Sequence, residues 1–226
     1  MQLYIGNKNY SSWSLRPWLL MKHSGIAFDE VKLRLALDAD TPFKRTLATF
    51  APAGRVPVLI DEGFAIWDTL AIAEYLAEKV PAQSLWPSQP LARARARSLC
   101  AEMHSGFGAL RNHFGMNIEA SLPEIGRKVL AEQPDAARDL ERIVQMWQQQ
   151  FREQGGPFLF GTFSIADAYF APVCTRIKTY ALPVPTPVQA YVERIHALPA
   201  MQEWTRGALA EHDFIDYDEP YRKAPV

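Results

Sequence analysis

The chain has 226 residues, of which 48% are hydrophobic and 22% are charged, and its formal net charge is -1. This composition is typical of a folded globular protein of one or two domains, and the near-neutral charge argues against a nucleic-acid-binding surface. The sequence has no apolar run of membrane-spanning length, and its first five residues lack the pattern of a signal peptide. We therefore predict a cytoplasmic protein with no membrane partner and no nucleic-acid partner.

The two cysteines, Cys100 and Cys174, lie far apart in segments of helical periodicity. Neither belongs to a C-x-x-C motif or to a Cys/His cluster, so the sequence indicates no disulfide framework and no metal site. We expect both thiols to be buried and unreactive.

Short strand patterns alternate with short helix patterns at the start of the chain. A serine cap at Ser14 would place Pro17 in the first helical turn, where its missing N–H costs nothing, and Gly25 would end that helix. We expect strands at 2–5 and 28–33, and helices at 14–23 and 42–47.

The stretch from Arg55 to Ile60 has the composition of a buried strand but contains Pro57. Because proline cannot donate to a sheet, we place Pro57 at the first residue of the strand. A cis Val56–Pro57 bond would leave the N–H and C=O of Val56 available to an extended ligand, whereas a trans proline would simply start the strand.

A hairpin turn at Glu62–Gly63, a short strand at 64–66 and a helix start at Asp68–Thr69 follow this strand. A strand with a leading proline, a hairpin and a capped helix form the second half of a thioredoxin-like domain. We predict that this domain spans residues 1–80.

Residues 81–90 contain three prolines and suit a linker better than a regular element. The sequence after this linker has helical periodicity only, so residues 91–226 are predicted to form an all-helical domain. The fold class is therefore α/β plus all-α. We expect helices at 91–117, 123–132, 135–153, 165–181, 187–197 and 200–210.

The loop before the first helix carries hydroxyls at Ser11, Ser12 and Ser14, where thioredoxin-fold oxidoreductases keep redox cysteines. A serine at a helix N-terminus cannot exchange disulfides, but it can donate a hydrogen bond to the thiolate of a ligand. Lowering a thiol pKa by two units requires about 2.7 kcal/mol. A charge-assisted hydrogen bond of about 1.5–3 kcal/mol and a helix terminus of about 0.3–1 kcal/mol supply that amount.

Asp68 and Thr69 taken alone would be an ordinary helix cap. Beside the Val56 backbone, they suit a ligand with an ammonium group for Asp68 and a carboxylate for Thr69. Glutathione carries both groups on its γ-glutamyl end and a thiol in its middle. Arg55 is a candidate for a glutathione carboxylate, or else an ordinary exposed arginine.

These motifs resemble those of the cytosolic glutathione S-transferases, and in particular the serine-using theta and zeta branches. The resemblance covers both domains and implies glutathione as co-substrate, no metal, and a homodimer. Ser164 and Asp167 form a capping box that is a folding signature of this family. The matching residues are Ser11, Ser12, Ser14, Arg16, Val56, Pro57, Asp68, Thr69, Ser164 and Asp167.

The resemblance aligns Ser11 with the catalytic serine of the zeta class and Ser12 with its neighbour, and it ranks Ser11 first. Zeta enzymes that isomerise maleylacetoacetate carry S-S-C-S, and Trp13 stands where that cysteine would be. Isomerase activity is kept as an alternative function because of the resemblance to the zeta class. Trp13 either lines the electrophile site or packs under the first helix.

The electrophile pocket is predicted to include Trp13 together with Met103, Phe107 and Arg111 from the helix expected at 91–117. Part of this apolar stripe should be core instead, and we expect His104 to have no catalytic role. The predicted function is a glutathione transferase that attacks a small apolar electrophile. A non-catalytic protein that binds glutathione or another ligand is a further alternative.

Overall fold

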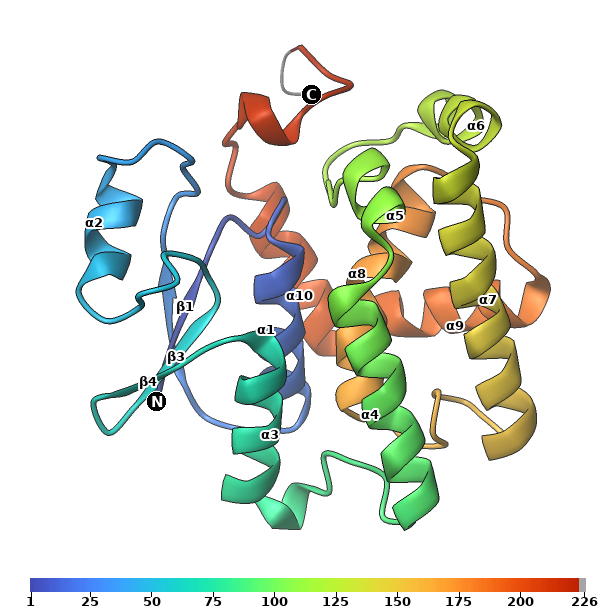
Figure 1. The fold of residues 1–226 in the computed structure, drawn as a ribbon, viewed down its shortest axis with the longest axis horizontal. Coiled ribbons are helices and arrows are strands. Elements are labelled where there is room, and N and C mark those ends of the chain that lie inside the picture. The colour runs from blue at the N-terminus through green and yellow to red at the C-terminus, as the bar shows by residue number, and fades with distance from the viewer. Residues whose placement is uncertain (224–226) are drawn as a thin grey trace.

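The computed structural model describes residues 1–223, in which a four-stranded sheet with three helices lies beside a larger helical part (Figure 1). The sheet has the strand order β2-β1-β3-β4. Strand β1 is parallel to β2 and antiparallel to β3, which pairs antiparallel with β4. The elements are β1 (Gln2–Ile5), α1 (Ser12–His23), β2 (Asp29–Lys32), α2 (Pro42–Ala48), β3 (Val58–Asp61), β4 (Phe64–Ile66) and α3 (Thr69–Lys79).

The two faces of this sheet bury different clusters, because successive side chains of a strand point to opposite faces. Leu3 and Leu59 belong to the main core with residues of α1 and α3. Val58 instead joins Phe43 and Leu47 of α2 in a smaller cluster. The sheet is therefore covered by α1 and α3 on one side and by α2 on the other.

Helix α8 lies at the centre of the helical part, packs against α1, α4 and α9, and is buried along almost its whole length. Its N-terminus has the expected capping box, in which the Ser164 N–H donates to Asp167 Oδ2 at 2.9 Å. The elements are η1 (Pro81–Gln83), α4 (Pro90–Ser105), α5 (Gly108–His113), α6 (Pro123–Glu132), α7 (Pro134–Gln154), α8 (Ile165–Thr179), α9 (Thr186–Ala197), α10 (Pro199–Leu209) and η2 (Asp216–Asp218). The predicted fold class is confirmed, whereas the residue boundaries of the two domains stay a prediction.

The two parts share one hydrophobic core. Trp18 of α1 packs edge-on against Trp204 of α10, with ring centroids 5.1 Å apart. The Trp204 indole N–H also donates to the Lys8 carbonyl at 3.0 Å. The helical part therefore supports the loop that leads into α1.

The predicted start of the first helix at Ser14 is wrong. Helix α1 begins at Ser12 with Ser11 at the N-cap, so Pro17 lies inside the helix and not in its first turn. The reason is that the Ser14 hydroxyl does not cap the helix but accepts the Gly6 N–H at 3.1 Å.

The helix expected at 91–117 is also wrong as a single element, because the chain breaks between α4 and α5. Phe107 adopts a left-handed backbone with φ 56°, and Gly106 packs so closely that a Cβ there would lie 2.8 Å from the Glu102 carbonyl oxygen. The two glycines around Phe107 permit this break. Arg111 therefore belongs to a different helix from Met103.

Candidate functional site

Three serines at the start of α1 are almost completely buried, namely Ser11 at the N-cap and Ser12 and Ser14 in the first turn. Ser11 Oγ donates to Ser14 Oγ at 2.7 Å, and Ser14 Oγ also accepts the Gly6 N–H. Among residues 1–223, the Ser12 hydroxyl has no side-chain hydrogen bond. Either Ser11 or Ser12 thus stays a candidate for the thiol donor.

The residues predicted to hold a peptide ligand lie at the start of β3 and of α3. The Val56–Pro57 bond is cis, and Val56 precedes β3, so its N–H and C=O are outside the sheet ladder. Asp68 is the N-cap of α3, and its Oδ1 accepts the Leu70 N–H at 3.0 Å. Arg55 and Asp68 are exposed, whereas Thr69 is buried.

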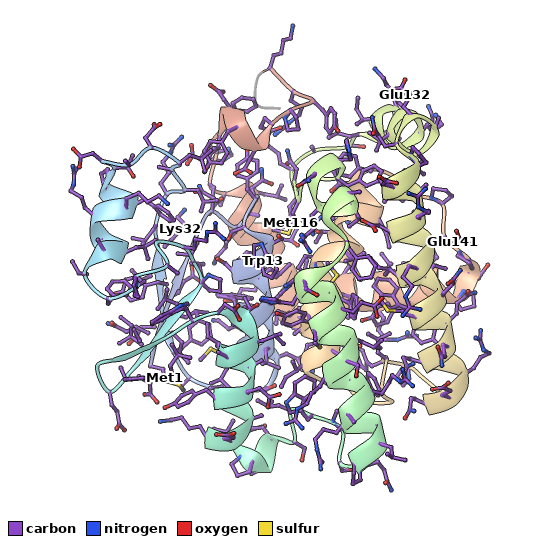
Figure 2. The ribbon with its side chains drawn as sticks, viewed as in Figure 1. Met1, Trp13, Lys32, Met116, Glu132 and Glu141 are labelled. Atoms are coloured by element: carbon purple, nitrogen blue, oxygen red, sulfur yellow. The ribbon has the colours of Figure 1, made fainter. Side chains whose placement is uncertain are left out.

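A cavity of about 360 Å³ brings these segments together. Trp13, from the first turn of α1, lies near the centre of the view in Figure 2 and forms one wall of the cavity. The lining residues are Trp13, Ala53, Arg55, Val56, Pro57, Trp67, Asp68, Thr69 and His104.

Other predicted site residues do not line this cavity. Ser11 and Ser12 directly precede Trp13, which lines the cavity, but they do not line it themselves. Met103 and Phe107 belong to the main core. Arg111 lies behind Trp13, with its guanidinium carbon 5.6 Å from the indole centroid, and it donates to the Met103 carbonyl at 3.2 Å. Burial lowers the pKa of Arg111. The expected apolar stripe is therefore mainly core, and of these residues Arg111 contacts Trp13.

The sequence did not predict that His104 lines this cavity or that Tyr169 lies behind it. The Nε2 of His104 lies 3.0 Å from Asp68 Oδ2, and its Nδ1 lies 2.8 Å from the hydroxyl of Tyr169, a residue of α8. That hydroxyl is also 2.7 Å from Thr69 Oγ1. No local signal in the sequence connects His104 with Tyr169, because the two residues are 65 positions apart.

A buried arginine supports the wall formed by Trp13. Arg16 lies between the rings of Trp13 and Tyr169, with its guanidinium carbon 4.0 and 4.2 Å from their centroids. Such cation–π contacts stabilise a desolvated guanidinium by about 2 kcal/mol. Burial lowers the pKa of Arg16 to about 10, so this side chain remains charged at neutral pH.

The C-terminal segment 211–222 binds the loop before α1 from the side of α10. The backbone N–H groups of Lys8 and Asn9 donate to the Glu211 carboxylate at 2.8 and 3.3 Å. The Tyr10 hydroxyl donates to Glu219 Oε1 at 2.7 Å, next to a hydrogen bond from Asn117 Nδ2 at 2.8 Å. The segment therefore fixes the backbone directly before Ser11.

Replacing Glu219 with glutamine is expected to lower the free energy of unfolding by about 1–3 kcal/mol, because a buried charged acceptor of several donors is lost. Besides Tyr10 and Asn117, Glu219 accepts the Arg222 Nε–H at 2.8 Å. Urea unfolding measures the loss. The matched control is Asp216→Asn, the same change at an exposed position of this segment, and equal stability of the two variants would contradict the prediction.

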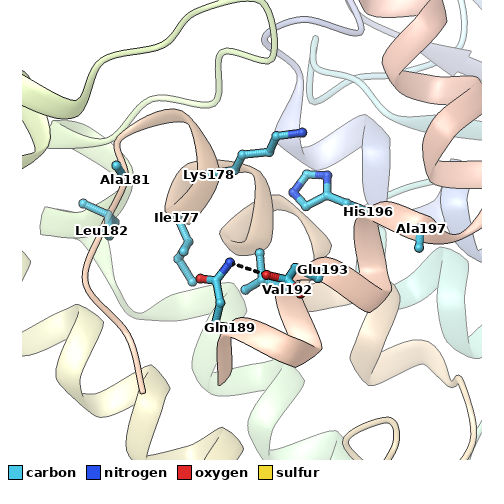
Figure 3. Close-up of a pocket in the computed structure, with 9 residues that line it drawn as sticks. All are labelled: Ile177, Lys178, Ala181, Leu182, Gln189, Val192, Glu193, His196 and Ala197. Atoms are coloured by element: carbon cyan, nitrogen blue, oxygen red, sulfur yellow. Dashed lines mark hydrogen bonds between the residues drawn. The ribbon is translucent and has the colours of Figure 1, made fainter. Parts of the chain in front are cut away.

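A second cavity, of about 600 Å³, lies between α8 and α9 and is lined by Lys178 and His196 among others (Figure 3). It is larger than the first cavity, but it contains none of the predicted site residues. Burial lowers the pKa of His196, whose Nε2 lies 3.3 Å from the Cys174 carbonyl oxygen. Volume alone does not identify a reactive site, so we place the candidate site at the cavity beside Trp13.

Within residues 1–223 there is no group of three or more His, Cys, Asp or Glu side chains placed to hold a metal ion. In the same part of the chain, every helix is too short or too polar to cross a membrane.

A thioredoxin-like sheet with a helix-start site, followed by an all-helical part, is the architecture of a glutathione S-transferase. The family model described as glutathione S-transferase, N-terminal domain, matches residues 10–79, and the model of the C-terminal domain matches residues 92–207. The chain belongs to the glutathione S-transferase family. The predictions of this family and of an enzyme are confirmed.

Individual relatives agree with this assignment. The maleylacetoacetate isomerase of Rattus norvegicus is 27% identical over 203 residues, which are 88% of this chain and 89% of that protein. The isomerase of the same name from Pseudomonas aeruginosa is 33% identical over 119 residues, 52% of this chain and 55% of that protein. A Burkholderia glutathione transferase homologue, solved with bound glutathione, is 27% identical, with a TM-score of 0.68 over 93% of this chain and 98% of that one.

Proposed function

We propose that this protein is a glutathione transferase in which a serine hydroxyl at the start of α1 ionises the glutathione thiol for attack on a small apolar electrophile. The observation that carries the proposal is the cavity of about 360 Å³, which unites Val56, the start of α3 and the first turn of α1. Its volume lies within the range of about 300–1,000 Å³ that small-molecule sites occupy.

Glutathione would lie with its cysteinyl backbone on Val56 and its γ-glutamyl end at the start of α3. Asp68 would accept the ammonium group, while the hydroxyl and N–H of Thr69 would bind the carboxylate, aided by the helix dipole. Arg55, exposed beside Pro57, is available to a second carboxylate. In this mode the thiol would point toward Ser11 and Ser12 at the start of α1.

Ser11 can donate a hydrogen bond to the thiolate only if the direction of its hydrogen bond with Ser14 reverses. If Ser14 donates to Ser11 across their 2.7 Å contact, the Ser11 hydrogen becomes available to the sulfur. Ser14 would still accept the Gly6 N–H, so the backbone would polarise this chain of hydroxyls toward the thiolate. Ser12 remains the alternative donor.

The electrophile would lie against the indoles of Trp13 and Trp67, which line the same cavity. We test the function by retention on immobilised glutathione together with conjugation of glutathione to a panel of aromatic halides. Retention with turnover is expected. Retention without turnover over the whole panel would instead support a non-catalytic binding protein.

A cis-trans isomerase of maleylacetoacetate-like substrates is the second candidate, favoured by the two relatives named maleylacetoacetate isomerase. Trp13 replaces the cysteine of the zeta-class motif, so this activity would require the serines alone to activate the thiol. Turnover of maleylacetoacetate analogues at a rate above that of the aromatic halides would favour the isomerase.

We further propose a cytoplasmic homodimer. Phe64 on β4 and Leu91 at the start of α4 are 71% and 86% exposed, and burying one such side chain is worth about 1.5–3 kcal/mol. Sedimentation at micromolar concentration should give twice the 25.5 kDa chain mass. We expect Phe64→Ser to raise the monomer fraction. Leu37→Ser should leave it unchanged, because Leu37, 66% exposed, follows β2 at the opposite edge of the sheet from β4. A monomeric wild type would contradict this prediction.

A further inference from the structure

His104 on α4 is connected to both residues at the start of α3, to Asp68 directly and to Thr69 through Tyr169. The three contacts measure 3.0 Å from His104 to Asp68, 2.8 Å from His104 to Tyr169 and 2.7 Å from Tyr169 to Thr69. We call these four residues the His104 relay. Asp68, Thr69 and His104 line the cavity, whereas Tyr169 is buried behind it.

The direction of the hydrogen bonds in the relay depends on whether His104 is protonated. An ionised carboxylate only accepts hydrogen bonds, so Nε2 carries a hydrogen toward Asp68 in either state. In the neutral imidazole Nδ1 is then an acceptor, and the Tyr169 hydroxyl donates to it. The Tyr169 oxygen must in turn accept the only hydroxyl hydrogen of Thr69.

Protonation of His104 reverses this order. Both ring nitrogens then donate, so Tyr169 accepts from Nδ1 and gives its own hydrogen to Thr69. The hydroxyl hydrogen of Thr69 is released toward a ligand. Burial raises the pKa of Tyr169 to about 12, so its phenol keeps the hydrogen that the relay requires in both states.

We propose that the His104 relay couples binding of a ligand carboxylate at Thr69 to the protonation of His104, the protonated state binding more tightly. The proposal rests on the proposed function, in which this carboxylate belongs to the γ-glutamyl end of glutathione. His104 and Tyr169 are positioning residues here, because they act on the ligand through Thr69.

The sign of the effect follows from the direction of the Thr69 hydroxyl. The γ-glutamyl end carries one ammonium at Asp68, which disfavours the protonated imidazole, and one carboxylate at Thr69, which favours it. The Thr69 hydroxyl makes the difference between the two states. It donates a charge-assisted hydrogen bond to the carboxylate when His104 is protonated, and it presents only a lone pair to the carboxylate when His104 is neutral. A coupling of about tenfold corresponds to about 1.4 kcal/mol, within the usual range for linked binding.

The surroundings of His104 carry fixed charges over the same pH range. The Trp13 ring packs edge-on against the imidazole, with centroids 5.3 Å apart, and two guanidinium groups lie against Trp13. Both stay protonated, since even the buried Arg16 has a pKa of about 10. A histidine is the side chain that ordinarily changes its charge between about pH 5 and 8. The groups that surround His104 are Asp68, Tyr169, Trp13, Arg16 and Arg111.

Isothermal titration with S-methylglutathione at pH 5.0 and 7.0 tests the proposal. Its thiol is blocked, and its ammonium and carboxylates keep their charges over this range. We expect the wild type to bind about three times more tightly at pH 5.0 than at pH 7.0. Tyr169→Phe and His104→Gln should each bring this ratio close to one. The control His113→Gln, on α5, should retain it.

Three results would overturn the proposal. Absence of binding at both pH values would overturn the relay and the proposed function together. Equal affinity at the two pH values, or tighter binding at pH 7.0, would overturn the relay and leave the proposed function standing. A wild-type ratio in Tyr169→Phe, with circular dichroism showing a folded variant, would exclude Tyr169 as the connection.

Titration of the histidine ring signals by NMR supplies a second readout that does not depend on affinity. Addition of S-methylglutathione at constant pH should raise the protonated fraction of His104 in the wild type, because linkage between proton and ligand is reciprocal. The same addition should leave that fraction unchanged in Tyr169→Phe. A fall in the protonated fraction on binding would contradict the proposed sign.

Discussion

Replacing Asp167 with alanine is expected to lower the free energy of unfolding by about 4 kcal/mol, a loss at the upper end for single substitutions. Asp167 is fully buried near the N-terminus of α8, and its carboxylate accepts from the Leu159 and Ser164 N–H groups and from the Tyr191 hydroxyl, at 3.0, 2.9 and 3.0 Å. Alanine would leave all three donors buried without a partner. Urea unfolding of the two proteins measures the difference.

The matched control for this prediction is Ser164→Ala, which removes the side chain of the same capping box but leaves the carboxylate and its other donors in place. Loss of an N-cap side chain costs about 1 kcal/mol. If the two variants were equally stable, Asp167 would act only as a cap and the buried hydrogen bonds would carry little stability.

The pH dependence of the same variant provides a second signature. Burial raises the pKa of Asp167 to about 6, above the value of about 3.9 in an unfolded chain. The stability that this group contributes is therefore fully present below about pH 4 and is lost as the pH rises through about 6. The stability difference between wild type and Asp167→Ala should be about 1–3 kcal/mol larger at pH 4 than at pH 7. Burial also raises the pKa of Asp218 to about 6. Because Asp218 is present in both proteins, its contribution to the pH dependence cancels in the stability difference.

The sequence predicted those parts of the site that depend on local backbone chemistry. Pro57 lacks an N–H donor, so it can only stand at the start or edge of a strand. The side chain of Asp68 caps a helix through the local backbone, so it indicates a helix start without reference to the rest of the fold. For the same reason the capping box at Ser164 and Asp167 was predictable. The start of α1 was not, because the partner of Ser14 is Gly6, eight residues earlier, and only the folded loop brings them together.

The surroundings of the cavity could not be predicted in the same way, because they depend on how α4 and α8 pack. His104 and Tyr169 are 65 residues apart and meet only when α8 lies between α1 and α4. Met103 was assigned to the pocket from helical spacing, but it lies in the main core, where α4 packs against α8. Apolar residues at helical spacing predict which face of a helix is buried, but they do not predict which element packs against that face.

Replacing Ser11 with alanine is expected to raise the pKa of the bound glutathione thiol by one unit or more, about 1.4 kcal/mol per unit, with little loss of glutathione affinity. Affinity should persist because Val56, Asp68 and Thr69 hold the rest of the tripeptide in the proposed mode. For a rise from about 6.5 to about 7.5, the thiolate fraction at pH 7, and with it the conjugation rate, would fall about threefold. An absorbance titration of the enzyme-bound thiolate measures the shift.

Ser12→Ala is the matched control, since it removes the same hydroxyl from the adjacent position of the same helix start. In the structure Ser11 already bonds to Ser14, so donation to sulfur requires their 2.7 Å contact to reverse, whereas Ser12 needs no such exchange. A neutral hydrogen bond is worth about 1 kcal/mol and a charged one about 1.5–3, so the thiolate can drive that reversal. A pKa shift confined to Ser12→Ala would move the role to Ser12. No shift in either variant would assign the thiolate to backbone N–H groups at the start of α1, where the helix dipole alone supplies about 0.3–1 kcal/mol.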